Sequence, residues 1–221
     1  VMAFAIRRGS GFTDFAGILA AAPPLRIAVA PDDGDNLLGW GGQRLLEAVG
    51  LSRTMLESWG GGYVEHLHPS ACLDALLRGE ADAVVQEGIM GPWWRNAVVE
   101  AGLRFLSLSP DNLAAVARTQ GWPAATLPAN YLDEQPDPVT TLDFADFALV
   151  VRDDMPEDVA HLLAWCLSET RGQLEAQFRH IPPERSPITY PLDPAAMART
   201  PIPLHPGAER HYRELGILSK G

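Results

Sequence analysis

The chain has 221 residues, of which 47% are hydrophobic and 20% charged, and its net charge at pH 7 is −11. This profile is typical of a globular protein long enough to form one large domain or two small ones. The basic residues form no stripe, which argues against nucleic acid or an anionic membrane surface as a partner. Every apolar run is shorter than the about 18 residues of a membrane-spanning helix, so we expect a chain that is not membrane-embedded.

Helices and strands are predicted from the apolar spacing along the chain. The opening "VMAFAI" is an apolar run typical of a strand, and the short helix after it has Thr13 as its expected N-cap. A buried strand is predicted over 25–30 and a helix over 37–49. Between them lies the loop "APDDGDN".

The rest of the chain continues to alternate between strands and helices. One strand is predicted between Met55 and residue 70, and further strands are predicted at 83–85, 103–109 and 147–151. The predicted helices lie at about 70–78, after Pro92, at 110–121, from Pro156 onward, and at 206–216. The Pro-rich stretch 181–206 is predicted to be irregular. This order indicates an α/β fold with a mostly parallel sheet flanked by helices.

In such sheets, ligands bind beyond the carboxyl ends of the strands. Two polar strand ends lie there, "PDDGDN" and "VVQEGI". A glycine-containing turn that leads into a helix N-terminus usually holds an anion, because its backbone N–H groups point at the loop. This loop instead carries Asp32, Asp33 and Asp35. It is interpreted as a ligand site, as a solvated turn capped by Asp35 or Asn36, or as an incomplete Ca²⁺ loop.

The second strand end offers Gln86 and Glu87 as hydrogen-bond acceptors in a cleft, and a simple strand-end turn is the alternative. Three tryptophans nearby in sequence, Trp40, Trp93 and Trp94, would enclose a cationic or apolar ligand, unless they pack in the core.

No catalytic or metal motif is recognised. Glu65, His66, His68 and Cys72 suggest zinc, but no second cluster completes a tetrahedral site, so no metal or cofactor is predicted. Cys72 and Cys166 match no redox spacing and are expected to be isolated thiols. Without a nucleophile motif or phosphate loop, we expect a protein that is not an enzyme.

Three segments carry a resemblance to a known family. "PIPLHPGAERHYRELG" resembles the closing motif of the TAXI family of TRAP-transporter solute receptors, and "GEADAVVQEGI" and "PLRIAVAPDDGDN" are similar to its cleft segments. The resemblance implies a type II periplasmic-binding-protein fold. It assigns residues 1–9 to a crossover strand, 10–146 to lobe two, and 147–221 to the return crossover and C-terminal helical part of lobe one. The N-terminal half of lobe one is then expected to be absent, and His205 is expected to order its loop.

The resemblance also implies a function. The protein is expected to capture a small polar metabolite in an interlobe cleft for a TRAP-type membrane permease, without a cofactor. It would act in the periplasm, or in the cytoplasm if the short chain is natural. The expected ligand-binding residues are Asp32, Asp33, Gly34, Asp35, Asn36, Trp40, Gln86, Glu87, Gly88 and Trp93.

The aspartates depart from the family pattern of glycine and small hydroxyl residues at this helix N-terminus. They favour a ligand with a cationic group, or one that arrives with a metal ion. The alternative is a truncated receptor that acts as a sensor or protein-interaction module without transport.

Overall fold

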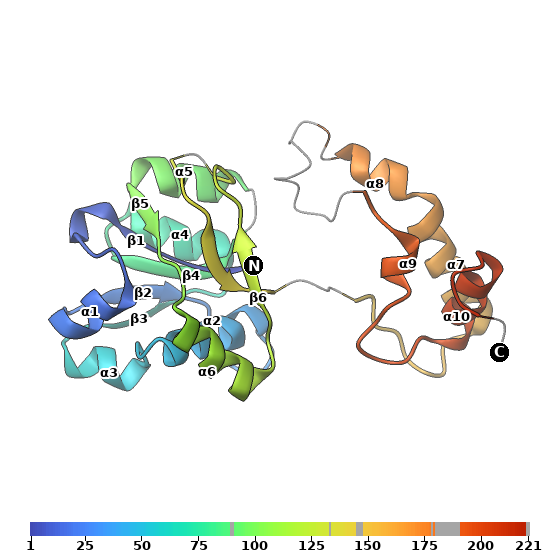
Figure 1. Ribbon diagram of the computed structural model, residues 1–221, viewed down its shortest axis with the longest axis horizontal. Coiled ribbons are helices and arrows are strands. Elements are labelled where there is room, and N and C mark those ends of the chain that lie inside the picture. The colour runs from blue at the N-terminus through green and yellow to red at the C-terminus, as the bar shows by residue number, and fades with distance from the viewer. Residues whose placement is uncertain (89–90, 133, 145–147, 178, 180–190, 220–221) are drawn as a thin grey trace. The chain divides into compact units, whose positions relative to one another are not determined.

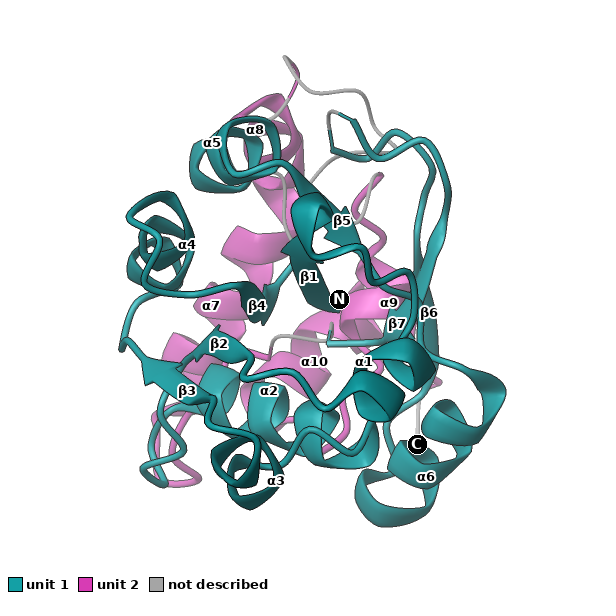
Figure 2. Cartoon of the chain, turned by 90° about the vertical axis from the view of Figure 1, so that its left-hand side faces the viewer, with its two compact units in different colours: residues 1–145 teal, residues 146–221 magenta. Residues whose placement is uncertain are grey.

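The computed structural model describes residues 1–88, 91–132, 134–144, 148–177, 179 and 191–219. The chain divides into two compact units, Val1–Ala145 and Asp146–Gly221, which we call unit 1 and unit 2 (Figure 2). Each unit is described by itself.

Unit 1 is built on a seven-stranded sheet with the order β3-β2-β4-β1-β7-β6, in which β5 also pairs with β1. The strands are β1 (Met2–Arg7), β2 (Arg26–Val29), β3 (Gly62–Glu65), β4 (Ala83–Glu87), β5 (Leu103–Phe105), β6 (Ala124–Leu127) and β7 (Val139–Leu142). Strand β2 runs parallel to β3 and β4, whereas β1 is antiparallel to β4, β5 and β7. Five of these seven strands therefore point the same way, which confirms the predicted mostly parallel sheet.

Helices cover both faces of this sheet. They are α1 (Phe15–Ala21), α2 (Leu37–Ala48), α3 (Arg53–Ser58), α4 (Pro69–Leu77), α5 (Pro92–Glu100) and α6 (Pro110–Gln120). Figure 2 shows α4 and α5 over one face and α1, α2, α3 and α6 over the other. Because side chains alternate across a strand, Val29 and Val85 pack toward α2, whereas Ala28 and Val84 pack toward α4.

Side-chain caps fix where several helices begin. The Asp14 carboxylate accepts from the N–H of Gly17 at 2.7 Å, so the N-cap of α1 is Asp14 and the prediction of Thr13 was wrong by one residue. Ser109 caps α6 in a capping box with Asn112. Each cap satisfies N–H groups that the first helical turn leaves without a partner.

The structure differs from the prediction of a strand over 147–151. Residues 148–151 form no strand, and position 147 lies outside the described residues. The sheet instead gains β6 and β7, which pair antiparallel, and Met2 of β1 lies opposite Leu142. The apolar run at 147–151 resembles a strand more strongly in sequence than "VTTL" at 139–142 does. The segment "VTTL" nevertheless forms the strand, because it pairs with β1 and β6.

Unit 2 contains α7 (Glu157–Glu169), α8 (Arg171–Gln177), α9 (Pro194–Met197) and α10 (Pro206–Glu214). The long predicted helix after Pro156 is divided at Thr170 into α7 and α8. Helices α7 and α10 pack closely because position 207 is glycine, where a Cβ atom would lie 2.1 Å from the carbonyl oxygen of Glu157. Arg210 also pairs with Asp158 at 2.8 Å.

Candidate functional site

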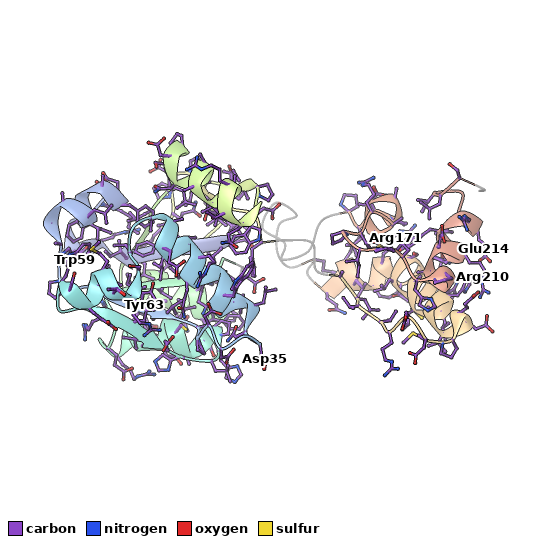
Figure 3. All side chains as sticks on the ribbon, turned by 90° about the horizontal axis from the view of Figure 1, so that it is seen from below. Asp35, Trp59, Tyr63, Arg171, Arg210 and Glu214 are labelled. Carbon is purple, nitrogen blue, oxygen red and sulfur yellow. The ribbon has the colours of Figure 1, made fainter. Side chains whose placement is uncertain are left out.

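The carboxyl ends of β2, β3, β4 and β7 meet at one edge of the unit 1 sheet. Strand β1 runs the other way, so Met2 lies at this edge too, opposite Glu87. We call this region the carboxyl edge, and it comprises residues 30–36, 65–68, 87–88 and 143–144. Figure 3 shows Asp35 at this edge and Trp59 at the other end of the unit.

The acidic loop after β2 binds its own backbone. One carboxylate oxygen of Asp33 accepts from the N–H of Asp35 at 3.1 Å and from the N–H of Asn36 at 2.9 Å. The Asn36 side chain accepts from the N–H of Gly39 at 3.1 Å and so caps α2. Gly34 has a φ of +91°, a conformation that glycine adopts without strain. Two backbone N–H groups of this loop are therefore occupied by Asp33.

Arginines neutralise two other carboxylates of this edge. Asp32 pairs with Arg44 at 3.0 Å, and Arg44 also pairs with Glu47 at 2.9 Å. Glu65, at the end of β3, pairs with Arg53 at 2.6 Å. These ion pairs fix the rim of the carboxyl edge.

Gln43 of α2 joins the ends of β2 and β3. Its buried amide donates to the carbonyl of Ala30 at 3.1 Å and to the carboxylate of Glu65 at 3.2 Å. The helix can approach this closely because position 39 is glycine, where a Cβ atom would lie 1.8 Å from the carbonyl oxygen of Pro31. Gly39 and Gln43 therefore hold the acidic loop against α2.

Asp35 and Glu87, at the same edge, have no arginine partner among the residues that the structure describes. Within the described part of the chain, no side-chain ion pair involves Asp35 or Glu87. Asp35 is exposed, whereas Glu87 is partly buried at the end of β4. Burial raises the pKa of the Glu87 carboxyl, and the positive charge of the Val1 amino group partly opposes this rise. A carboxylate in this setting is stabilised by a cation that comes to lie beside it.

The remaining residues expected from "VVQEGI" have other surroundings. Gln86 is only 1% exposed, and its amide donates to the thiol sulfur of Cys72 at 3.2 Å, so the side chain belongs to the core. Gly88 is buried, and a Cβ atom there would lie 3.1 Å from a methyl of Val1. Only Glu87 of this group reaches the carboxyl edge with a partly exposed side chain.

The three tryptophans do not form a common wall. Trp94 is fully buried, and its indole N–H donates to the carbonyl of Glu87 at 2.8 Å. Trp93 is 36% exposed and lies against Gly91. Trp40 instead packs edge-on against Trp122 at 4.8 Å between ring centroids, and Trp122 packs against Phe144 at 6.1 Å.

The cysteine and histidines near β3 do not assemble a metal site. Cys72 is buried, and its thiol donates to the carbonyl of His66 at 3.4 Å. Burial raises the pKa of this thiol, which disfavours the thiolate that zinc requires. Both cysteines are free thiols.

Sequence reasoning missed the residues that support the edge, namely Gln43, Arg44, Arg53 and Trp122. Two of them carried a usable signal. Gln43 and Arg44 lie seven and eight residues after the cap Asn36, a spacing that returns to the same helix face. Arg53 and Trp122 come from separate elements, and no local spacing connects them to the loop.

A mostly parallel sheet between helical layers, with polar loops at its carboxyl edge, is the architecture of a periplasmic-binding-protein-like domain. Residues 39–216 match the model of the NMT1-like family. The chain therefore belongs to the NMT1-like family, a periplasmic binding-protein-like family of substrate-binding proteins rather than enzymes. Membership implies a small-molecule ligand. A search of curated proteins found no match.

No helix among the described residues is both long and apolar enough to cross a membrane.

Proposed function

We propose that the carboxyl edge of unit 1 captures a small polar metabolite that bears a cationic group, such as an amine. One observation carries this proposal: the Asp33 carboxylate occupies the N–H groups of Asp35 and Asn36, two of the backbone donors of the loop that leads into α2. An incoming anion would meet the Asp33 carboxylate in place of these two amides.

Charge at the edge supports the same conclusion. Arg44 and Arg53 are already paired, whereas Asp35 and Glu87 lack arginine partners in the described structure. A ligand ammonium would gain favourable interactions with both, and it would relieve the cost of partly burying Glu87. The ring of Trp40, partly exposed at the first turn of α2, supplies apolar surface for the rest of the ligand.

A thermal-shift panel on the full chain tests the proposal, with primary amines, neutral amino acids, dicarboxylates, and Ca²⁺ with and without chelator. A ligand present at one hundred times its dissociation constant stabilises a protein by about 2.7 kcal/mol, which shifts the melting temperature by several degrees. We expect a shift with one or more amines.

Variants locate the ligand. Asp35→Asn and Glu87→Gln should each lower the affinity for the amine by about tenfold, the effect of losing about 1.4 kcal/mol of charge interaction. Glu57→Gln, an exposed position on α3, is the matched control and should leave affinity unchanged. A shift with dicarboxylates alone, or amine binding that is insensitive to Asp35 and Glu87, would contradict the proposal. If Ca²⁺ raised the melting temperature of the wild type but not that of Asp35→Asn, the loop would be a metal-cation site instead.

We further propose that the protein is a periplasmic receptor that delivers its ligand to a TRAP-type permease, as the TAXI-like segments suggest. Co-purification of the chain with its permease in the presence and absence of the bound amine tests this step. Ligand-dependent association is expected.

A second function, recognition of a protein partner, is favoured by one feature of unit 2. Val159, Leu162 and Trp165 of α7 are 44%, 55% and 45% exposed and share one side of the helix. A chain that acts as an interaction module would give no shift with any compound in the panel. Its partner binding would then be weakened by Leu162→Ala.

A further inference from the structure

The strongest cluster of metal-ligating side chains lies in unit 2, among residues that the proposed ligand capture does not use. It comprises His161 of α7 with His211 and Glu214 of α10. One candidate ligand atom from each of these residues lies within 4.8 Å of the others. Among the described residues, this is the one group of three that satisfies that condition.

The helix pair holds the three side chains together. His211 and Glu214 are three residues apart on α10, so they share a face of that helix. His161 reaches them from α7: its Nε2 atom lies 2.8 Å from a carboxylate oxygen of Glu214. The two imidazole rings are 5.3 Å apart between centroids and nearly perpendicular.

Contacts outside the cluster fix its frame. Gly207 brings the first turn of α10 against Glu157 of α7. Arg210, one residue before His211, pairs with Asp158 at 2.8 Å. The Ser168 hydroxyl lies 3.1 Å from Nε2 of the buried His211, an outer contact of the kind that orients metal-ligating imidazoles. Figure 3 shows Arg210 and Glu214 on the same side of unit 2.

We propose that His161, His211 and Glu214 bind one Zn²⁺ ion. Two imidazoles and one carboxylate form a donor set that zinc uses with an open fourth position, which water or a further ligand fills. Ligand atoms around a tetrahedral zinc ion lie roughly 3.4 Å apart, given metal–ligand distances of about 2.1 Å. His161 and Glu214 therefore need to separate slightly from 2.8 Å, and a pair of ligand atoms near the 4.8 Å limit of the cluster needs to close on the ion.

This site is independent of the ligand proposed for unit 1. Zinc in unit 2 would join α7 to α10 and stabilise the folded form of that helix pair, because the unfolded chain does not present the three ligands together.

Calorimetric titration of the full, chelator-treated chain with Zn²⁺ tests the proposal, together with the visible absorption of bound Co²⁺, which reports tetrahedral coordination. One ion per chain is expected. Glu214→Gln and His161→Ala should each lower the affinity for zinc by more than about tenfold. Loss of an outer-shell partner alone lowers metal affinity by at least about that much. Both positions are partly or largely exposed, so folding should survive these changes.

The controls are matched. Glu209→Gln makes the same substitution on the same helix, at a carboxylate that pairs with Arg213, and should leave zinc affinity unchanged. The double variant His66→Ala/His68→Ala removes the histidines near β3 and should also bind zinc normally. The proposal is overturned if the wild-type chain takes up no stoichiometric zinc, or if zinc binding is lost in the double variant but kept in Glu214→Gln.

Discussion

Asp33 accepts a hydrogen bond from the backbone N–H of Asn36 at 2.9 Å, and the same oxygen accepts from Asp35. The loop therefore supplies the anion that the start of α2 attracts. This contact explains why a turn of the anion-binding type carries a carboxylate: the Asp33 side chain takes the place of a bound anion on these N–H groups.

The first prediction concerns Asp33 itself. Asp33→Ala removes the acceptor of two N–H groups and should lower the free energy of unfolding by about 1 kcal/mol. Asp33→Asn keeps an acceptor oxygen and should lose less. Urea unfolding of both variants measures the difference. Equal stability of Asp33→Ala and the wild type would mean that these hydrogen bonds contribute nothing to folding.

A second prediction follows from the contact between Gly39 and Pro31. Alanine usually stabilises a helix relative to glycine, by up to about 1 kcal/mol. At position 39 its Cβ atom would lie 1.8 Å from a carbonyl oxygen, so steric overlap outweighs helix propensity. Gly39→Ala should lower the free energy of unfolding by more than about 2 kcal/mol.

The control is Gly9→Ala, where no heavy atom lies within 4 Å of the added Cβ. Denaturant unfolding of both variants should give a large loss at position 39 and a small change at position 9. If both variants lost a similar amount of free energy of unfolding, the close approach of α2 to the loop would not be the reason that position 39 is glycine.

The sequence predicted most of the elements of unit 1 because their signals are local. Apolar spacing located β1, β2, α2 and α4, and Asn36 was one of the two caps expected for α2. The buried position of Gln86 was not predictable in this way. Its amide contacts Cys72, fourteen residues earlier, so its direction depends on how α4 packs on β4.

The errors have the same cause. Strand β7 exists because Leu142 lies opposite Met2, a pairing across 140 residues that no window along the chain detects. The surroundings of the tryptophans, for which core packing was one of the two interpretations, depend on distant contacts in the same way. Trp40 packs against Trp122 of a distant segment, while Trp94, close to Trp93 in sequence, lies on the core side of α5.

A third prediction uses Asp82, which joins β4 to β2. Burial alone would raise the pKa of Asp82, but hydrogen bonds and charge from Arg26 lower it. Arg26 donates through its backbone N–H at 3.0 Å and through its guanidinium at 2.7 Å. A lowered pKa means that this stabilisation is present above the ordinary aspartate pKa of about 3.9 and is lost as pH falls through the folded value.

Asp82→Asn should therefore lower stability near neutral pH by about 1 kcal/mol, since solvent screens this pair. The difference from the wild type should shrink in acid as Asp82 becomes protonated. Urea titrations across the acidic range measure it. A difference that stays constant with pH would assign the effect to packing rather than to charge.

The last prediction concerns unit 2 in metal-free buffer. Burial lowers the pKa of His211, and the charge of His161 adds to this, whereas Glu214 and Glu169 oppose it. The unfolded chain then binds a proton more readily than the folded one, so stability is lost as pH falls below the ordinary histidine pKa of about 6.5. NMR titration of the His211 ring should give a midpoint below the ordinary histidine pKa of about 6.5. Because protons and zinc compete for the same imidazoles, bound Zn²⁺ should move the His211 transition to still lower pH. A midpoint for His211 at or above the ordinary histidine pKa of about 6.5 would contradict the neutral, buried imidazole on which this coupling depends.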